Sequence, residues 1–168
     1  MSRDESSSVK VTRFGALAYG LAALAVVLDQ LVKSWFLGLG LVPGGSTPLI
    51  GPLHLTMVWN QGVSFGLFNA NHDLTRWALT VFSLGVAGAL AWWARTATRP
   101  LIGLGLGLVM GGAVGNAIDR VRFGAVVDFF DVTRIGFFPW VFNVADSAIT
   151  VGVVCLLLDS IRREPQPA

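Results

Sequence analysis

The stretch LIGLGLGLVMGGAVGNAIDR, residues 101–120, decides how this chain folds. Four of its glycines recur at every fourth position: Gly103, Gly107, Gly111 and Gly115. Positions four apart share one face of a helix, so these glycines would form a groove along it. In lipid, small residues that let backbones approach closely are a recognised source of helix association. The row therefore predicts a membrane helix that packs tightly against other helices.

A second row of the same stretch carries polar groups beside this groove. Gly112, Asn116 and Arg120 are also four residues apart, so they share the adjacent face. Because that face borders the packing surface, we expect these side chains to point into a helical bundle.

The composition is that of a membrane protein. Of the 168 residues, 54% are hydrophobic and 13% are charged, and the mean hydropathy is +0.66. The length suits one domain, residues 1–168. The formal net charge is +2, but the basic residues are scattered singly, which argues against a nucleic-acid partner.

Four apolar segments are long enough to cross a bilayer, which takes about 20 helical residues. They predict spans over residues 14–36, 75–94, 101–119 and 141–160. The first segment could instead be a signal peptide. DQLVK follows it, however, where a cleaved signal would have small residues, so we expect a retained helix.

Four crossings put both termini on one side of the membrane. Seven basic residues fall on that side: Arg3, Lys10, Arg13, Arg95, Arg99, Arg162 and Arg163. Five fall across the membrane: Lys33, Arg76, Arg120, Arg122 and Arg134. Cytoplasmic segments carry the excess of Lys and Arg, so we expect cytoplasmic termini.

The outer connections predict a small sheet. LHLTMVW (53–59) and VSFGLF (63–68) are short strand-forming pieces separated by turn residues. His54 and His72 belong to this region, but no cysteine or acidic residue stands at ligand spacing, so we expect no metal site. The predicted fold is an all-α membrane protein with four transmembrane helices and a small β-rich outer platform.

Two aspartates are candidates for catalysis. Asp146 lies inside the fourth span, where an ionised group costs about 2.5–3.5 kcal/mol and marks a functional site by default. Asp128 lies in GAVVDFFDV, which is too short for a confident helix and could fold back over the bundle to face Asp146. Two such carboxylates would share one proton, as in an aspartic protease that needs no cofactor. Asp131, three residues from Asp128, remains a rival.

The other acidic residues have structural interpretations. We expect Asp119 to form an interfacial ion pair with Arg120 and Arg122. Three further aspartates have similar interpretations: Asp131 could pair with Arg134, Asp29 could be an anchor for Lys33 at i+4, and Asp159 is expected at a cytoplasmic helix end.

Five segments together carry a resemblance to a known family: DQLVK (29–33), WNQGVSFG (59–66), GGAVGNAIDR (111–120), VVDFF (126–130) and FNVADSAIT (142–150). In order and approximate spacing, the set resembles bacterial lipoprotein signal peptidase, signal peptidase II. Gln61, Val63 and Ser64 depart slightly from the residues that members often carry in the second segment.

The resemblance implies an intramembrane aspartic endopeptidase, inhibited by globomycin, that cleaves diacylglyceryl-modified prolipoproteins before the lipidated cysteine. It implies Asp128 and Asp146 as the catalytic pair, in preference to Asp131. It also implies supporting or substrate-binding roles for Asp29, Asn60, Gly112, Asn116, Arg120 and Asn143. No metal or cofactor is implied. The expected partners are prolipoproteins and membrane lipid, and the expected state is a monomer in the bacterial inner membrane with the site near the periplasmic face.

Two other functions compete with this interpretation. Intramembrane Asp, Asn and Arg also build the relays of ion-coupled transporters, although four spans are few and no inverted repeat of broken helices is evident. A non-enzymatic assembly factor could instead use the glycine groove to bind a partner helix.

Overall fold

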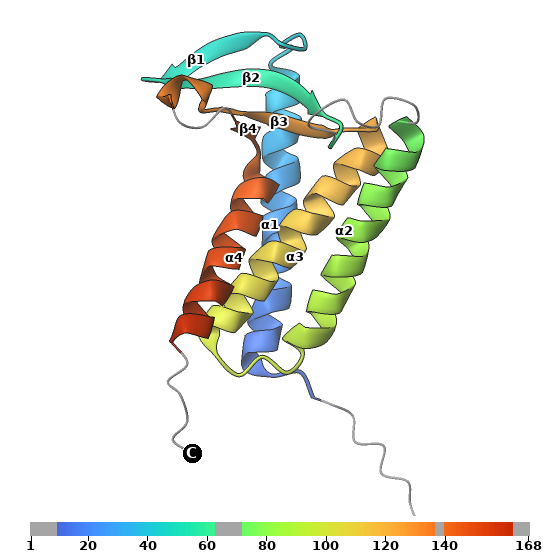
Figure 1. Cartoon of the computed structure of the whole chain (residues 1–168), viewed down its shortest axis with the longest axis vertical. Coiled ribbons are helices and arrows are strands. Elements are labelled where there is room, and N and C mark those ends of the chain that lie inside the picture. Colours follow the sequence, from blue (N-terminus) through green and yellow to red (C-terminus); the bar gives the residue numbers. More distant parts are fainter. Residues whose placement is uncertain (1–9, 63–71, 137–139, 163–168) are drawn as a thin grey trace, which may run out of the picture.

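The computed structural model describes residues 10–62, 72–136 and 140–162. Within these residues, four long helices form a bundle and a four-stranded sheet covers one end of it (Figure 1). The helices are α1 (Arg13–Gly38), α2 (His72–Ala94), α3 (Pro100–Phe123) and α4 (Val144–Ile161). The strands are β1 (Ser46–Ile50), β2 (Leu53–Asn60), β3 (Val126–Asp131) and β4 (Val141–Phe142), with a short 3₁₀ helix, η1 (Thr133–Ile135). The predicted fold class is confirmed; the predicted strand at 63–68 lies outside the described residues.

Helix α3 is the centre of the bundle and contacts α1, α2 and α4. In its spanning window 72% of the residues are buried, against 22% or less in the other three helices. The glycine groove explains this difference. A Cβ on Gly103 or Gly107 would lie 2.7 or 2.6 Å from a backbone oxygen of α1, too close for a real side chain. The groove is thus filled by α1, and tight packing is confirmed.

The outward faces of the other helices are apolar. All four helices are long and apolar enough to cross a membrane. Large exposed hydrophobic side chains cover their outer surfaces, among them Val27 and Leu31 of α1, Val81 and Phe82 of α2, and Leu157 of α4. Such surfaces are unfavourable in water, so their natural surroundings are lipid chains.

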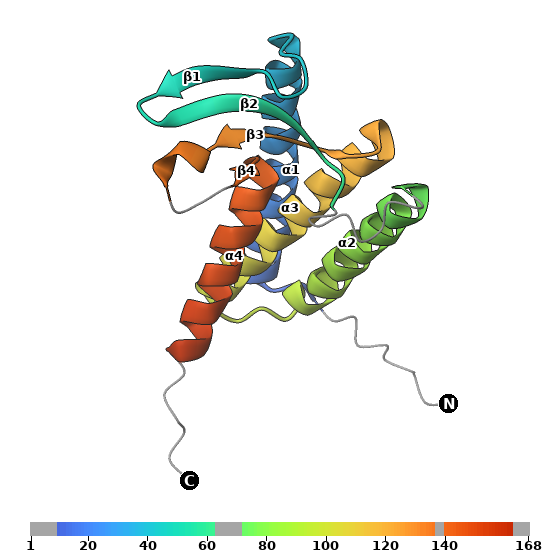
Figure 2. The same ribbon diagram turned by 45° about the horizontal axis from the view of Figure 1, so that its top comes forward.

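The sheet is antiparallel with the strand order β1-β2-β3-β4. It is joined closely to the bundle, because α3 ends at Gly124, whose φ of +82° turns the chain into β3. At the other edge β4 is followed directly by α4. In Figures 1 and 2 the β1–β2 hairpin extends over the α4 side of the bundle, away from α2.

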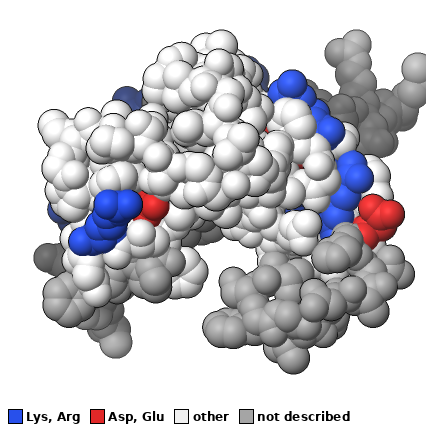
Figure 3. Space-filling view, turned by 90° about the horizontal axis from the view of Figure 1, so that it is seen from above, with Lys and Arg blue, Asp and Glu red and all other residues white. Residues whose placement is uncertain are grey.

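A hydrophobic cluster fixes the sheet on the end of α1. It consists of Phe36, Leu55, Met57, Val127 and Phe129, all almost fully buried. The rings of Phe36 and Phe129 stack with their centroids 4.8 Å apart. Seen from above, the sheet end shows basic side chains in two groups and little acidic surface (Figure 3). Asp119, Asp128 and Asp131, which lie at this end, are buried.

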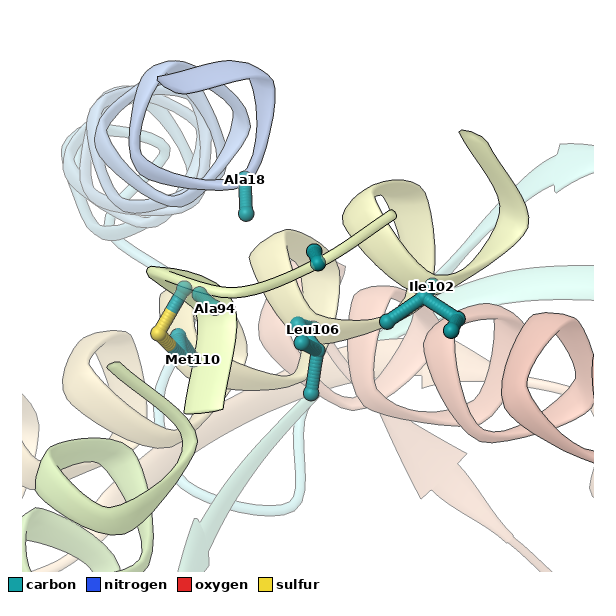
Figure 4. Close-up of a cluster of buried hydrophobic side chains, with 6 residues drawn as sticks. Ala18, Ala94, Ile102, Leu106 and Met110 are labelled. Carbon is teal, nitrogen blue, oxygen red and sulfur yellow. The ribbon is translucent and has the colours of Figure 1, made fainter. Parts of the chain in front are cut away.

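The opposite end of the bundle has a core of its own. Ala18, Ala94, Ile102, Leu106 and Met110 pack together there (Figure 4). The beginning of α1 and the end of α4 lie at this end, away from the sheet (Figure 1).

One ion pair joins two elements at this end. The carboxylate of Asp159, near the end of α4 as expected, accepts from Arg99, the residue before α3, at 3.1 Å.

Candidate active site

Strand β3 carries Asp128 beneath the sheet, where its side chain is 1% exposed. One carboxylate oxygen accepts a hydrogen bond from Asn60 Nδ2 at 2.9 Å, and the other accepts from Asn143 Nδ2 at 2.6 Å. Burial, and to a smaller extent the nearby Asp146 carboxylate, raise the pKa of Asp128 to about 7, against the lowering effect of the two asparagine hydrogen bonds. Asp128 is therefore a carboxyl group that holds a proton near neutral pH.

Asp146 lies in the first turn of α4 and is half-buried. Asn143 caps this helix, and the two residues form a capping box. The Asn143 side chain accepts from the Asp146 backbone N–H at 2.8 Å, and the Asp146 carboxylate accepts from the Asn143 N–H at 3.3 Å. Asp146 Oδ1 also accepts from Asn116 Nδ2 at 2.8 Å. The N-terminal end of a helix favours negative charge, and Asp146 occupies that end of α4.

Asn143 connects the two carboxyl groups. Its side chain donates to Asp128 and accepts from the backbone of Asp146, and it is itself fully buried. The two aspartates, eighteen positions apart in the sequence, thus share one hydrogen-bonding residue. This arrangement brings together the two candidates that the sequence singled out.

A cavity of about 610 Å³ opens beside the pair. Asp146 and Asn60 contribute polar atoms to its wall, and Trp140, Phe142 and Val151 are among its apolar lining. Since Asp128 is almost inaccessible, the cavity reaches the pair from the side of Asp146. Its mixed wall suits an extended peptide with apolar side chains.

The polar row of α3 points into this region, as the sequence predicted. A Cβ on Gly112 would collide with the backbone oxygen of Ala145, so glycine lets the start of α4 lie directly on α3. Asn116 contacts Asp146. Arg120 donates weakly to the Asn116 carbonyl at 3.4 Å, and its buried Nε has no hydrogen-bond partner among the described residues.

Asp119 does not form the predicted ion pair with Arg120 and Arg122. It is fully buried and contacts Lys33 Nζ at 2.8 Å. Asp29 also contacts Lys33 Nζ at 2.8 Å, which agrees with the i+4 spacing. The prediction for Asp119 was wrong because its place in the glycine groove turns it toward α1, whereas the two arginines point elsewhere.

Lys33 is the residue that sequence reasoning undervalued. It is 2% exposed and lies between the two aspartates. The DQLVK spacing suggested one partner, but the second comes from another helix. Long lysine side chains near helix ends usually extend to water, so its burial had no local signal.

Asp131 lies apart from the pair. Its carboxylate accepts from Thr56 Oγ1 at 2.6 Å and from the Thr133 hydroxyl and N–H at 2.6 and 2.9 Å. Burial acts to raise the pKa of Asp131, but these hydrogen bonds outweigh it and lower the pKa below its usual value. Threonines, rather than Arg134, are thus the recorded partners of this acid.

The fold and the enclosed carboxyl pair define a polytopic membrane protein with a polar site under its sheet. Two solved structures, each titled as a bacterial membrane enzyme determined by the in meso method, share this fold. One, at 1.9 Å resolution, gives a TM-score of 0.78 at 26% identity, covering 92% of this chain and 98% of the other. The second, at 2.3 Å resolution, gives a TM-score of 0.74 at 25% identity, covering 95% of this chain and 98% of the other.

The sequence comparison is more specific. Residues 21–162 match the family described as signal peptidase (SPase) II, and the chain belongs to this family. A lipoprotein signal peptidase of Caulobacter vibrioides is 57% identical over 159 residues, covering 94% of each chain. One from a Methylobacterium species is 45% identical over 150 residues, covering 88% of this chain and 90% of the relative. The resemblance expected from the five motifs is confirmed, and the chain is a peptidase of the hydrolase class.

Proposed function

We propose that this chain removes signal peptides from prolipoproteins by an aspartic mechanism in which Asp128 and Asp146 act together. The observation that supports this most directly is that Asn143 hydrogen-bonds to both residues. The substrate is proposed from the relatives, which are named lipoprotein signal peptidases. The bond cleaved is the one before a diacylglyceryl-modified cysteine, as the family resemblance implies.

The unequal surroundings of the two acids suggest a division of labour. Ionised Asp146 takes a proton from a water molecule whose oxygen attacks the scissile carbonyl carbon. Protonated Asp128 gives its proton to the carbonyl oxygen, so the intermediate is a neutral diol. The carbon–nitrogen bond then breaks as the amine takes the proton held by Asp146, and a diol hydroxyl returns a proton to Asp128. Both acids end in their starting states.

The remaining site residues support peptide binding. The scissile backbone loses its contacts with water in this site and needs new hydrogen-bond partners. Asn60 lies at the cavity wall, and Arg120 has an unpartnered Nε among the described residues, so both suit the carbonyls of a bound peptide. Gly112 and Asn116 set the position of Asp146, and Asn143 that of both acids.

The proposed setting is the bacterial inner membrane, with both termini in the cytoplasm and the sheet at the periplasmic face. The basic residues Lys10, Arg13, Arg95, Arg99 and Arg162 support this orientation, since they lie toward the end away from the sheet. A monomer suffices, because α1, α3, α4, β2 and β3 of one chain, with the α4 cap residue Asn143, supply all the named site residues around the pair.

The two competing functions find less support. Helices α1 to α4 are each continuous from their first to their last residue, whereas a transporter site is usually built from broken helices. The glycine groove is filled by α1 of the same chain, so it offers no surface for a partner helix.

Purified protein and a synthetic lipidated prolipoprotein peptide test the proposal. Asp128→Asn and Asp146→Asn should each lower kcat by roughly 10³-fold or more, because each removes a proton-transfer group. Asp131→Asn is the matched control and should keep full turnover. Globomycin should inhibit the wild-type protein. Full turnover by either Asp128→Asn or Asp146→Asn would rule out the paired mechanism.

A further inference from the structure

A buried charge cluster, defined here as Asp29, Lys33 and Asp119, lies directly behind the catalytic pair. All three side chains are 2% exposed or less, and both carboxylates contact Lys33 Nζ at 2.8 Å. Their charges do not cancel, because two carboxylates surround one ammonium. Burying such a group is costly unless every partner is satisfied. Its position next to the site therefore needs an explanation.

Each carboxylate of the cluster holds the backbone next to one catalytic residue. Asp29 Oδ1 accepts from the N–H of Ala145 at 2.8 Å, and Ala145 directly precedes Asp146. Asp119 Oδ2 accepts from the N–H of Val127 at 3.1 Å, and Val127 directly precedes Asp128. The cluster thus joins the first turn of α4 to strand β3 through two backbone contacts.

Lys33 makes a third contact toward the pair. Its Nζ donates to Asn116 Oδ1 at 3.2 Å. A side-chain amide has one oxygen and one NH₂ group, so a donor fixed on the oxygen leaves the NH₂ group for Asp146 Oδ1, which it meets at 2.8 Å. Asn143 Nδ2 donates to the same oxygen at 3.2 Å, so the ammonium and Asn143 together set which way the Asn116 amide faces.

We propose that Lys33 is a positioning residue, whose ammonium orients Asn116 and holds together the two carboxylates that fix the backbones of Asp128 and Asp146. It touches neither substrate nor the reacting atoms, because it is enclosed by α1, α3 and the sheet. The inference rests on the proposed function, since it gives the cluster a role only if these two aspartates react.

Two variants separate positioning from folding. Lys33→Met leaves two buried carboxylates without a cation and should destabilise the protein strongly. Lys33→Met combined with Asp119→Asn restores the net charge of the cluster, and the asparagine oxygen can still accept from Val127. The double variant should regain most of the lost thermal stability, but it still lacks the ammonium, so Asn116 Oδ1 keeps only its contact from Asn143.

Turnover should therefore stay low in the folded double variant. We expect kcat about 10²-fold below wild type with KM nearly unchanged, because misplaced groups slow the chemical step while the substrate cavity is intact. Recovery of kcat together with thermal stability would overturn the proposal.

Asp159→Asn is the matched control for the loss of a buried charge. Its partner Arg99 lies at the far end of the bundle, so the variant should lower the thermal midpoint without changing kcat. An equal fall in kcat in this control and in the double variant would also overturn the proposal, since turnover would then follow stability alone. Asp128→Asn and Asp146→Asn, assayed in parallel, separate the two claims. If they are inactive while the double variant is fully active, only the positioning role fails; if they are active, the paired mechanism fails.

Discussion

Asp128 and Asp146 occupy unequal surroundings although one asparagine contacts both. Asp128 is enclosed under the sheet, where the loss of water disfavours its charge. Asp146 lies at the N-terminal end of a helix and at the wall of the cavity, where charge is tolerated. Differences of this kind are how two identical side chains come to act as acid and base.

The pH dependence of turnover should reflect the pKa of Asp128. That pKa is raised to about 7, so the proton that the mechanism needs is present below pH 7 and is lost above it. We expect kcat/KM to fall about tenfold per pH unit on the alkaline side of this value. Initial rates with the lipidated peptide between pH 5 and 9 measure the profile. A profile that stays flat to pH 9 would contradict the assignment.

The raised pKa of Asp128 also makes the folding stability depend on pH. The ordinary pKa of the Asp128 carboxyl is 3.8, so between about pH 4 and 7 the folded protein holds a proton that the unfolded chain releases. Folding is therefore weakened as pH rises through this window. The thermal midpoint of Asp128→Asn should fall less than that of the wild type between pH 4 and 7. If the thermal midpoints of the two proteins changed with pH in the same way, the pKa of Asp128 in the folded protein would not be raised.

Asn143 combines capping of α4 with a contact to Asp128, and a serine can separate the two. Serine is about as good an N-cap as asparagine, but it is too short to donate to Asp128. Asn143→Ser should keep the cap but lose the amide contacts to Asp128, to Asn116 and to the Val127 carbonyl, so we expect a lower thermal midpoint and a kcat about 10²-fold lower. Asn143→Ala should lose roughly a further 1 kcal/mol of stability, because it also removes the cap. Equal turnover in wild type and Asn143→Ser would show that the contact is dispensable.

The sequence singled out the two candidate aspartates but not the residues that hold them in place. Asp146 stood out because a charge inside an apolar span is costly. The choice of Asp128 over Asp131 came from the family resemblance, since three residues of a strand look alike from sequence. The ion pair of Asp119 was misassigned, because Lys33 comes from a helix more than eighty residues earlier in the chain. Contacts of that range leave no local pattern.

At the scale of elements, small residues decide how closely the helices approach. Gly105 of α3 and Gly152 of α4 each lie so near the other's backbone that a Cβ would come within 2.8 Å of an oxygen. Gly112 of α3 packs in the same way against the backbone oxygen of Ala145, closer to the site. The start of α4 is thus held against α3 at one defined distance, and Asp146 is held with it.

Gly112→Ala tests this spacing. The added methyl group would collide with the carbonyl of Ala145, so the first turn of α4 must shift away from α3. We expect a loss of about 1–3 kcal/mol of stability from overpacking and about 10²-fold in kcat from the displaced Asp146. Turnover with the lipidated peptide and thermal unfolding in detergent measure the two effects.

Gly85→Ala is the control for the same chemical change. Gly85 lies in α2 with no atom within 4 Å of an added Cβ. Alanine favours helix by about 1 kcal/mol over glycine, so this variant should be as stable as wild type or more so, with unchanged kcat. If both variants behave alike, the close approach at Gly112 has no catalytic role.

The helices were predictable from the sequence, whereas the sheet was predictable only as a tendency. Spanning length and hydropathy mark α1 to α4 directly. The β2 piece was also evident from its composition. Its pairing with β3 was not, because the two strands are separated by a complete helical hairpin, and register depends on which faces become buried.

At the scale of the whole molecule, the charges are arranged along the bundle axis. The sheet end holds Lys33 in a closed cluster with two aspartates, so this cation adds little to the surface. The connection between α2 and α3, at the other end, carries Arg95 and Arg99 without a nearby acid in sequence. Loop arginines of this kind oppose translocation, which favours the sheet facing the periplasm.

Cysteine labelling tests this orientation. With Cys155→Ala removing the native thiol, Pro48→Cys places a thiol on exposed β1 and Thr98→Cys places one in the exposed α2–α3 connection. In intact spheroplasts a membrane-impermeant maleimide should label the first variant and leave the second unlabelled until the membrane is opened. Both variants should still cleave the lipidated peptide, since neither position borders the site. Labelling in the reverse pattern would place the carboxyl pair at the cytoplasmic face, where the α2–α3 arginines would then have crossed the membrane against the usual charge bias.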